Sequence, residues 1–247
     1  IIKIIDHIDL VASNYKINSE IAIVNTEPLN VELLISDDLY NILNIAEDIS
    51  RLSNGAYNIM LGKVSSKLGF APDFDMDLIQ DNDGGYLLIN NNKLIKKSTN
   101  WFDLSSIAKG YAVQRIHDYL IKNNLPNHLI DIGGEVIING TNYSEPWKIG
   151  IQDPNSVTSN PIYIIKNTNA SFLSIATSGE YRNFKTNSLG LIDTHTINPN
   201  SLRSIKPDSL SVTVISSKSA TYADGYAAAF NAMSVNKSLE IANANDI

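Results

Sequence analysis

Between residues 128 and 216 the chain is a series of short apolar runs, rich in β-branched residues and bounded by Gly, Pro, Asn or Asp. Runs of this kind predict β-strands joined by turns. We expect strands at residues 128–138, 147–151, 162–165, 171–176 and 210–216. Since strands cluster in the middle of the chain and helical patterns mostly precede them, we predict an α+β fold with a mixed, largely antiparallel sheet and flanking helices.

Three segments have the periodicity of amphipathic helices. Residues 36–53 begin with capping oxygens on Ser36, Asp37 and Asp38, followed by apolar residues three and four apart. A second helix follows residues 103–106 and ends at Asn123–Asn124, with an apolar stripe of Ala112, Ile116, Tyr119 and Leu120. A third, from about residue 222 to 233, is rich in Ala, and its small side chains suit close packing against a sheet or a ligand. Residues 90–92 are interpreted as a turn.

Composition limits the classes of function. With 247 residues, 43% of them hydrophobic, the chain can bury a core without a staple, and we interpret residues 1–247 as a single domain. The absence of Cys excludes disulfides, thiolate-ligated metals and a thiol nucleophile. A net charge of −7 (19 − 26) disfavours nucleic acid and anionic lipid as partners. The chain begins at Ile1 instead of Met and ends shortly after a helical pattern, so we expect it to be trimmed at both ends.

Two glycine-containing segments could bind a ligand. Residues 103–110 read as a strand end that turns into a helix, where free N–H groups favour an anion and Lys109 adds a positive charge. The alternative is an ordinary helix cap, formed by Asp103 or by a Ser, beside a solvated lysine. Residues 131–135 place Gly133 and Gly134 inside an apolar strand, which indicates either a β-bulge or the close approach of a ligand.

Three later segments carry polar groups that are also compatible with ordinary structural roles. Thr177 and Ser178 follow a predicted strand, where they could line a crevice or form a turn. His195 lies beside a rigid turn and could be a hydrogen-bonded structural residue. Asp224 opens an Ala-rich helix, either as a cap or as one ligand of a hard cation.

In their order along the chain, these segments resemble the ApbE family of FAD:protein FMN transferases. The resemblance is carried by residues 103–110, 131–135, 146–154, 177–179 with Tyr181, 195–199 and 223–224. In the N-terminal half it continues through residues 13–15, 19–21, Asn25 and 53–57. It extends in register over about the whole chain, and it implies an ApbE-like (T-fold-like) domain with an FAD cleft.

The resemblance implies transfer of the FMN part of FAD to a Ser or Thr hydroxyl of an acceptor protein, with Mg²⁺ and release of AMP. Asp224 matches the family's metal carboxylate, and the carbonyl near Ser106 its main-chain ligand. Lys109 matches the lysine beside flavin and phosphates, and His195 the histidine that takes the acceptor's proton. The remaining matches surround the FAD cleft: Tyr57, Asp103, Asp131, Gly133, Gly134, Thr177 and Ser178. The family resemblance also suggests an extracytoplasmic, lipid-anchored protein.

Several positions depart from the family's pattern. Ala228 stands where a Thr completes the metal site, Asn58 and Asn198 stand where Asp is usual, and Ser105–Ser106 replace Gly-Gly. Because ligand number and charge set Mg²⁺ affinity, we expect weaker metal binding than in a typical member. The alternative function is therefore an FAD-binding protein, or a slow FAD hydrolase, that has lost transfer. Residues 208–213 faintly resemble the Asp-x-x-Ser/Thr-x-Thr spacing of the family's acceptor sites, but we interpret them as a strand with solvated hydroxyls.

Overall fold

A computed structural model describes residues 1–72, 85–156, 160–179, 184–186, 192–245 and 247. Its helices are α1 (Ile2–Ala12), α2 (Glu20–Thr26), α3 (Asp37–Leu52), α4 (Gly62–Lys67), α5 (Ala108–Lys122), α6 (Ala220–Asn231) and α7 (Val235–Asn245). Its first strands are β1 (Glu32–Leu34), β2 (Tyr86–Ile89), β3 (Lys93–Lys96), β4 (His128–Ile132), β5 (Glu135–Asn139), β6 (Thr141–Asn142) and β7 (Glu145–Pro146). The others are β8 (Lys148–Gln152), β9 (Pro161–Lys166), β10 (Leu173–Gly179), β11 (Phe184–Thr186), β12 (Ile192–Thr194), β13 (Ile197–Asn198), β14 (Arg203–Ser204) and β15 (Ser211–Ser216).

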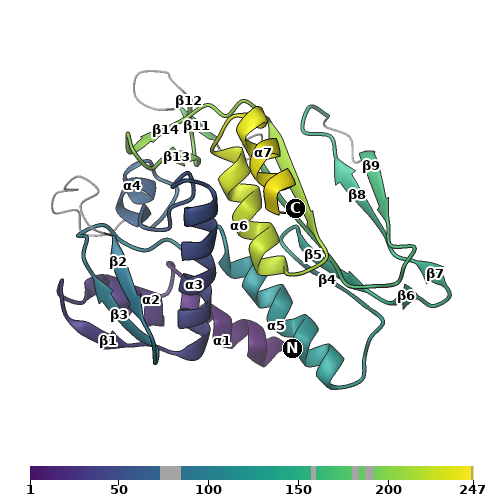
Figure 1. The fold of residues 1–247 in the computed structure, drawn as a ribbon, viewed down its shortest axis with the longest axis horizontal. Coiled ribbons are helices and arrows are strands. Elements are labelled where there is room, and N and C mark those ends of the chain that lie inside the picture. The colour runs from purple at the N-terminus through teal and green to yellow at the C-terminus, as the bar shows by residue number, and fades with distance from the viewer. Residues whose placement is uncertain (73–84, 157–159, 180–183, 187–191, 246) are drawn as a thin grey trace.

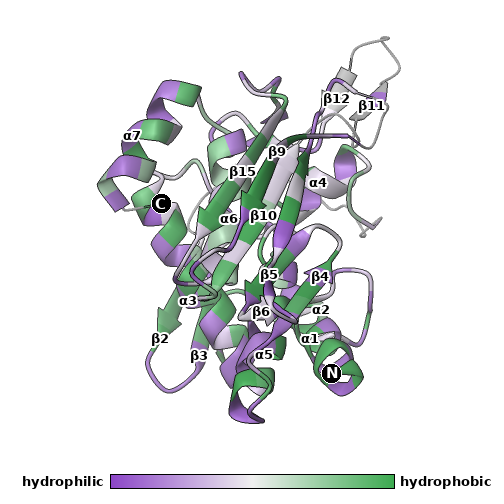
Figure 2. Cartoon of the chain, turned by 90° about the vertical axis from the view of Figure 1, so that its right-hand side faces the viewer, coloured by the Kyte–Doolittle hydropathy of each residue, from purple (hydrophilic) through white to green (hydrophobic). Residues whose placement is uncertain are grey.

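The central sheet has the strand order β15-β10-β5-β4, and every ladder among the described residues is antiparallel. Helices α5 and α6 cover one face, where Val113 and Ala220 pack on Ile137 of β5. The β8–β9 hairpin covers the other face and lies on the right in Figure 1. In Figure 2 strand β9 lies in front of this sheet. The predicted α+β class with a largely antiparallel sheet is confirmed.

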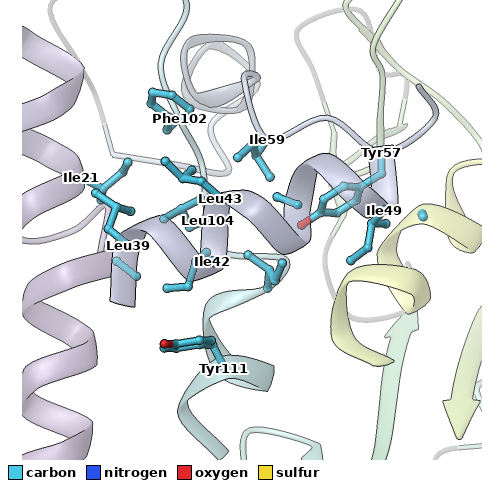
Figure 3. Packing of buried hydrophobic residues seen from close by; sticks show 14 of the residues in the cluster. Ile21, Leu39, Ile42, Leu43, Ile49, Tyr57, Ile59, Phe102, Leu104 and Tyr111 are labelled. Carbon is cyan, nitrogen blue, oxygen red and sulfur yellow. The ribbon is translucent and has the colours of Figure 1, made fainter. Parts of the chain in front are cut away.

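Helix α3 matches its predicted bounds and packs its apolar face into the largest core cluster. The Ser36 side chain caps it by accepting a hydrogen bond from the Leu39 N–H. Leu39, Leu43 and Ile49 are fully buried, and Figure 3 shows them beside Phe102, Leu104 and Tyr57, which come from later segments. This packing joins α3 to the segment that leads into the predicted site.

Helices α5 and α6 also lie where the periodicity predicts them. The burial of one residue of α5 and the first residue of α6 differ from the prediction. Ala112 and Ile116 face the core, but Tyr119 is 45% exposed, so its place in the apolar stripe was wrong. Val113 is fully buried in its stead, because α5 has sheet on one side and α6 on another. Helix α6 begins two residues earlier than predicted, where the Ser219 hydroxyl caps it.

Residues 128–138 form a hairpin instead of one strand with a bulge. Strands β4 and β5 pair from His128↔Asn139 to Ile132↔Glu135, and Gly133 and Gly134 make the two-residue turn. Both glycines have positive φ, 63° and 103°, which is the conformation that tight hairpin turns require. The apolar run on both sides of the glycines hid the reversal of the chain.

The structure adds elements that the sequence pattern did not predict. Helices α1, α2 and α4 and the three-stranded sheet β1-β3-β2 surround α3. The predicted turn at residues 90–92 joins β2 to β3, with φ of 66° at Asn91 and 58° at Asn92. Thr177 and Ser178 lie inside β10 rather than after it. No helix built from the described residues is long and apolar enough to cross a membrane.

Candidate functional site

A cleft of about 920 Å³ lies where α6, the β4–β5 turn, strand β8 and the end of β10 converge. It is open to solvent and is lined by both charged and apolar side chains. All the site residues predicted from the sequence line it: Tyr57, Asp103, Ser106, Lys109, Asp131, Gly133, Gly134, Thr177, Ser178, His195 and Asp224. The fold thus brings together residues that are up to 167 positions apart (224 − 57).

Asp224 is the buried carboxylate of this cleft. Its Oδ2 accepts a hydrogen bond of 2.8 Å from the N–H of Gly110, so the start of α5 holds it in place. A Cβ at Gly110 would lie 2.5 Å from the Ala220 carbonyl oxygen and 2.5 Å from the Asp224 Cβ, so only glycine allows α5 and α6 to approach this closely. Burial, then the negative charge of Glu135, raises the pKa of Asp224 well above its usual range, although Lys109 and the Gly110 N–H act in the opposite direction.

Lys109 forms an ion pair with a residue that the sequence did not single out. Its Nζ lies 2.5 Å from Oε2 of Glu135, whose side chain is only 4% exposed, whereas that of Lys109 is 45% exposed. Burial raises the pKa of Glu135 more than the adjacent lysine lowers it. The β4–β5 turn beside this pair is fixed by the Asp131 Oδ1, which accepts the Gly134 N–H at 3.0 Å. Lys109 is therefore an oriented cation with an exposed side toward the cleft.

Two hydroxyl groups that line the cleft meet near α6. The Tyr57 hydroxyl lies 3.0 Å from Ser106 Oγ, and the Tyr57 N–H donates to Ser53 Oγ at 3.1 Å. Burial raises the pKa of Tyr57, so the phenol stays protonated at neutral pH. The Ser106 main chain lies in the turn of residues 105–107, which leads directly into α5.

Two hydrogen bonds orient the Asp103 side chain, and two more fix the residue before it. Its Oδ1 accepts hydrogen bonds from Asn14 Nδ2 at 2.9 Å and from the Ser105 N–H at 3.0 Å. The preceding residue, Phe102, is clamped by the buried Asn25 side chain, which accepts the Phe102 N–H at 2.7 Å and donates to its carbonyl at 3.1 Å. Asn14 and Asn25 are far from Asp103 in the sequence, but through these hydrogen bonds they fix the position of Asp103 and of Phe102 before it.

The lining of the cleft also includes the hydroxyl groups of Thr177 and Ser178 and the imidazole of His195. Thr177 Oγ1 lies 2.9 Å from Thr213 Oγ1 across β10 and β15, so the partly exposed Thr213 hydroxyl also has a partner within the sheet. His195 lies after β12, with its ring centroid 6.2 Å from that of Phe70 in an edge-on arrangement. Tyr181, part of the sequence resemblance, falls outside the described residues.

The residues that depart from the family's sequence pattern fall into two groups, those that line the cleft and those that do not. Asn58 and Ala228 line the cleft, and Ala228 lies one helical turn after Asp224 on α6. Asn198 does not line it: its Oδ1 accepts the N–H groups of Asn200 and Ser201 at 2.9 and 3.0 Å. An Asp could accept the same two bonds, so this substitution keeps the turn.

The donor atoms fit a hard cation. Asp224 offers a buried carboxylate whose Oδ1 accepts no hydrogen bond from the described residues, and main-chain and hydroxyl oxygens lie in the same cleft. The part of the chain that the structure describes contains no group of three or more His, Cys, Asp or Glu side chains able to hold a metal ion. A divalent cation here would therefore need oxygens from a bound ligand or water in addition to Asp224.

Sequence reasoning missed some residues of the cleft. Glu135 was noticed only as the end of the Gly-Gly segment, because nothing in the sequence shows that it meets Lys109, 26 positions earlier. Phe70 also lines the cleft and has no motif of its own, and Tyr15 and Lys148 were matched only as members of longer segments, residues 13–15 and 146–154. Their apolar or basic character becomes meaningful only once the fold places them around the same cavity.

Comparison with known proteins extends over the whole chain. The model of the ApbE family matches residues 1–247. An FAD:protein FMN transferase of Vibrio cholerae is 29% identical, covering 99% of this chain and 75% of the relative, and one of Haemophilus influenzae is 28% identical, covering 95% and 72%. The solved structure of the flavin transferase ApbE from Vibrio cholerae superposes with a TM-score of 0.83 at 28% identity, covering 99% of this chain and 80% of that one.

Proposed function

The chain belongs to the ApbE family, and from this premise we propose that it transfers the FMN part of FAD to a Ser or Thr hydroxyl of an acceptor protein. The observation that carries the proposal is the placement of Lys109, His195 and Asp224 on the walls of one cleft that is large enough for a dinucleotide. A protein hydroxyl can reach such a cleft only if an exposed, flexible segment presents it.

The reaction that we propose is a substitution at the phosphorus atom of the FMN half. The acceptor oxygen forms a bond to this phosphorus, the P–O bond to the AMP half breaks, and AMP leaves with the bridging oxygen. The hydroxyl proton passes to His195, because a neutral imidazole nitrogen can accept a proton as a general base. The products are a phosphoester-linked flavin on the acceptor and free AMP.

The cleft supplies the charge that this substitution requires. Lys109, held by Glu135, offsets the negative charge of the diphosphate while it is attacked. Asp224 and the main-chain carbonyl of Ser106 would hold Mg²⁺, which when bound neutralises the diphosphate and favours departure of AMP. Tyr57, Asp103, Asp131, Gly133, Gly134, Thr177 and Ser178 surround the dinucleotide in this proposal.

One observation favours a second candidate function. Ala228 places a methyl group one turn after Asp224, where the family pattern has a hydroxyl ligand. If water does not replace that ligand, the protein would bind FAD and hydrolyse it slowly without transferring FMN. The two candidates differ in their dependence on metal and on acceptor.

The test is an incubation with FAD, with and without Mg²⁺ and with and without a hydroxyl-bearing acceptor protein. Chromatography measures FAD, FMN and AMP, and intact mass spectrometry measures FMN on the acceptor. Transfer predicts Mg²⁺-dependent AMP in amounts equal to the modified acceptor, and Asp224→Ala should abolish it while Lys237→Glu, on the remote helix α7, should not. Tight FAD binding without metal-dependent AMP would favour the second candidate, and no binding of FAD would exclude both.

A further inference from the structure

Strand β8 turns its edge, rather than one of its faces, toward the cleft. Five consecutive residues, Lys148–Gln152, line the cavity. Side chains of a strand alternate between its two faces, so a face could contribute only every second residue. A consecutive run means that the main-chain edge of β8 borders the cavity. The other edge of β8 is paired with β9, as the hairpin in Figure 1 shows.

The register of the hairpin shows which main-chain groups point to that free edge. The Asn167 N–H donates to the Trp147 carbonyl at 3.0 Å, so this opposing pair is a hydrogen-bonded one. Hydrogen-bonded and non-bonded pairs alternate in an antiparallel ladder. Lys148 and Gly150 therefore direct their N–H and C=O groups away from β9, and no hydrogen bond from another described segment reaches them.

The edge is held in a fixed position relative to the central sheet. Ile149, Ile151 and Ile165 of the hairpin pack against apolar side chains of β5 and β10, which include Val136 and Ile175. The edge groups of Lys148 and Gly150 are two residues apart, which is about 6.6–6.8 Å along a strand. An extended peptide has the same two-residue spacing. A partner strand could therefore hydrogen-bond to Lys148 and to Gly150 without any movement of the hairpin.

The charges beside this edge favour an acidic partner. Lys148 and Lys166 are directly opposite each other in the register and both are exposed. Like charges in opposing positions destabilise a hairpin, and this chain has a net charge of −7, so two facing lysines are a local exception. An acidic side chain placed between them would remove the repulsion.

We propose that an extended segment of the acceptor protein adds to β8 as a third strand of the hairpin. Its main chain pairs with Lys148 and Gly150, and an acidic side chain of the segment lies next to Lys148 and Lys166. The outer edge of β9 is less suitable, because it starts with Pro161, which has no N–H, and it does not line the cleft. This inference rests on the proposed function, since it states how the acceptor reaches the cleft.

The experiment uses a synthetic peptide with the sequence of residues 206–216, which contains one Asp and four hydroxyl residues. Each of its non-proline amides is N-methylated in turn, and FMN transfer and peptide binding to the FAD-loaded protein are measured. A peptide added as a strand bonds β8 through every second residue only. We expect methylation at alternate positions to reduce binding at least tenfold and methylation between them to have little effect.

Each result decides the question. If methylation reduced binding equally at neighbouring amides, or at none of them, the inference would be overturned. The flavin ring, and not the acceptor, would then contact the edge of β8. Release of AMP from FAD without any binding of millimolar peptide would also overturn it, because strand addition needs no folded partner. Failure to bind or cleave FAD at all would instead be a failure of the proposed function.

A charge exchange tests the acidic contact separately. Lys166→Glu should weaken binding of the peptide several-fold, and a peptide with Lys in place of its Asp should recover the loss. The variant also creates an opposite-charge pair with Lys148, so the hairpin should remain folded. Lys237→Glu on α7 is the matched control for the change in net charge. Equal losses in both variants, or no recovery with the exchanged peptide, would contradict the contact.

Discussion

Nζ of Lys109 lies 2.5 Å from the buried Oε2 of Glu135, and the positive charge of the same lysine also favours ionisation of the buried Asp224. Two carboxylates that line the cleft therefore share the charge of one lysine. In the proposed function, a divalent cation would bring the missing positive charge to this site, and Lys109 would help to hold the diphosphate bound with it.

Replacing Glu135 by Gln should separate binding from catalysis. The substitution keeps the volume but removes a negative charge, so FAD without metal should bind several-fold more tightly. The rate of AMP release should fall about tenfold or more, which corresponds to losing about 1.4 kcal/mol or more of positioning of Lys109 in the transition state. FAD fluorescence titration and AMP release measure the two effects. Glu145→Gln, on the exposed strand β7, is the control.

A weaker affinity for FAD together with an unchanged maximal rate would contradict this assignment. That outcome would mean that Glu135 contributes only to the general stability of the cleft. A loss of both properties with a lowered melting temperature would point the same way, so thermal unfolding of the variant is measured alongside.

Gly110→Ala should disturb both the helix contact and the site. The new Cβ would be 2.5 Å from the Ala220 carbonyl oxygen and from the Asp224 Cβ, so α5 and α6 would have to separate. Overpacking of this kind costs about 1–3 kcal/mol, and each kcal/mol lowers the melting temperature of a domain of this size by about 2–4 °C. Mg²⁺-dependent AMP release should also fall, because the Gly110 N–H no longer fixes Asp224. An unchanged melting temperature would show that the helices are less tightly packed than the structure indicates.

Features of the fold and the site that depend on residues close together in the sequence could be predicted, and features that depend on distant residues could not. Helix α3 could be predicted because its cap at Ser36 and its apolar spacing are local signals. The Gly133–Gly134 hairpin could not, because apolar residues flank both sides of the turn and only pairing shows that the chain reverses. Glu135 as a site residue was equally out of reach, since its role depends on a lysine from another element. The grouping of the predicted site residues in one cleft followed from a family resemblance and not from any single motif.

Ala228→Thr should restore a ligand to the proposed metal site. Ala228 lines the cleft one turn after Asp224, and residues at this spacing lie on the same face of a helix. A hydroxyl in this position should raise Mg²⁺ affinity about tenfold, the effect of about 1.4 kcal/mol. Titration of AMP release with Mg²⁺ measures it, and Ala228→Val, which has the same shape without the oxygen, is the control. Equal behaviour of the two variants would contradict the assignment.

Asp38 should make the free energy of unfolding depend on acid pH. Its carboxylate accepts hydrogen bonds from the Tyr111 hydroxyl at 2.6 Å and from His7 Nε2 at 2.8 Å, and it lies 3.3 Å from Arg115 Nε. Burial opposes ionisation, but these partners together lower the pKa of Asp38 below its ordinary value of 3.8. A lowered pKa stabilises the folded state above the unfolded value, and this stabilisation is lost as the pH falls through the folded value.

Asp38→Asn should therefore destabilise the protein at pH 7 by about 1–3 kcal/mol, the cost of removing a charged partner from partly buried hydrogen bonds. The difference from the unmodified protein should shrink as the pH falls below 3.8, because the native carboxylate is then losing its charge as well. Asp37→Asn is the matched control, since it removes a charge from the same first turn of α3 but not from this cluster. Urea unfolding at several pH values measures both variants, and a difference that stays constant with pH would contradict the role of the charge.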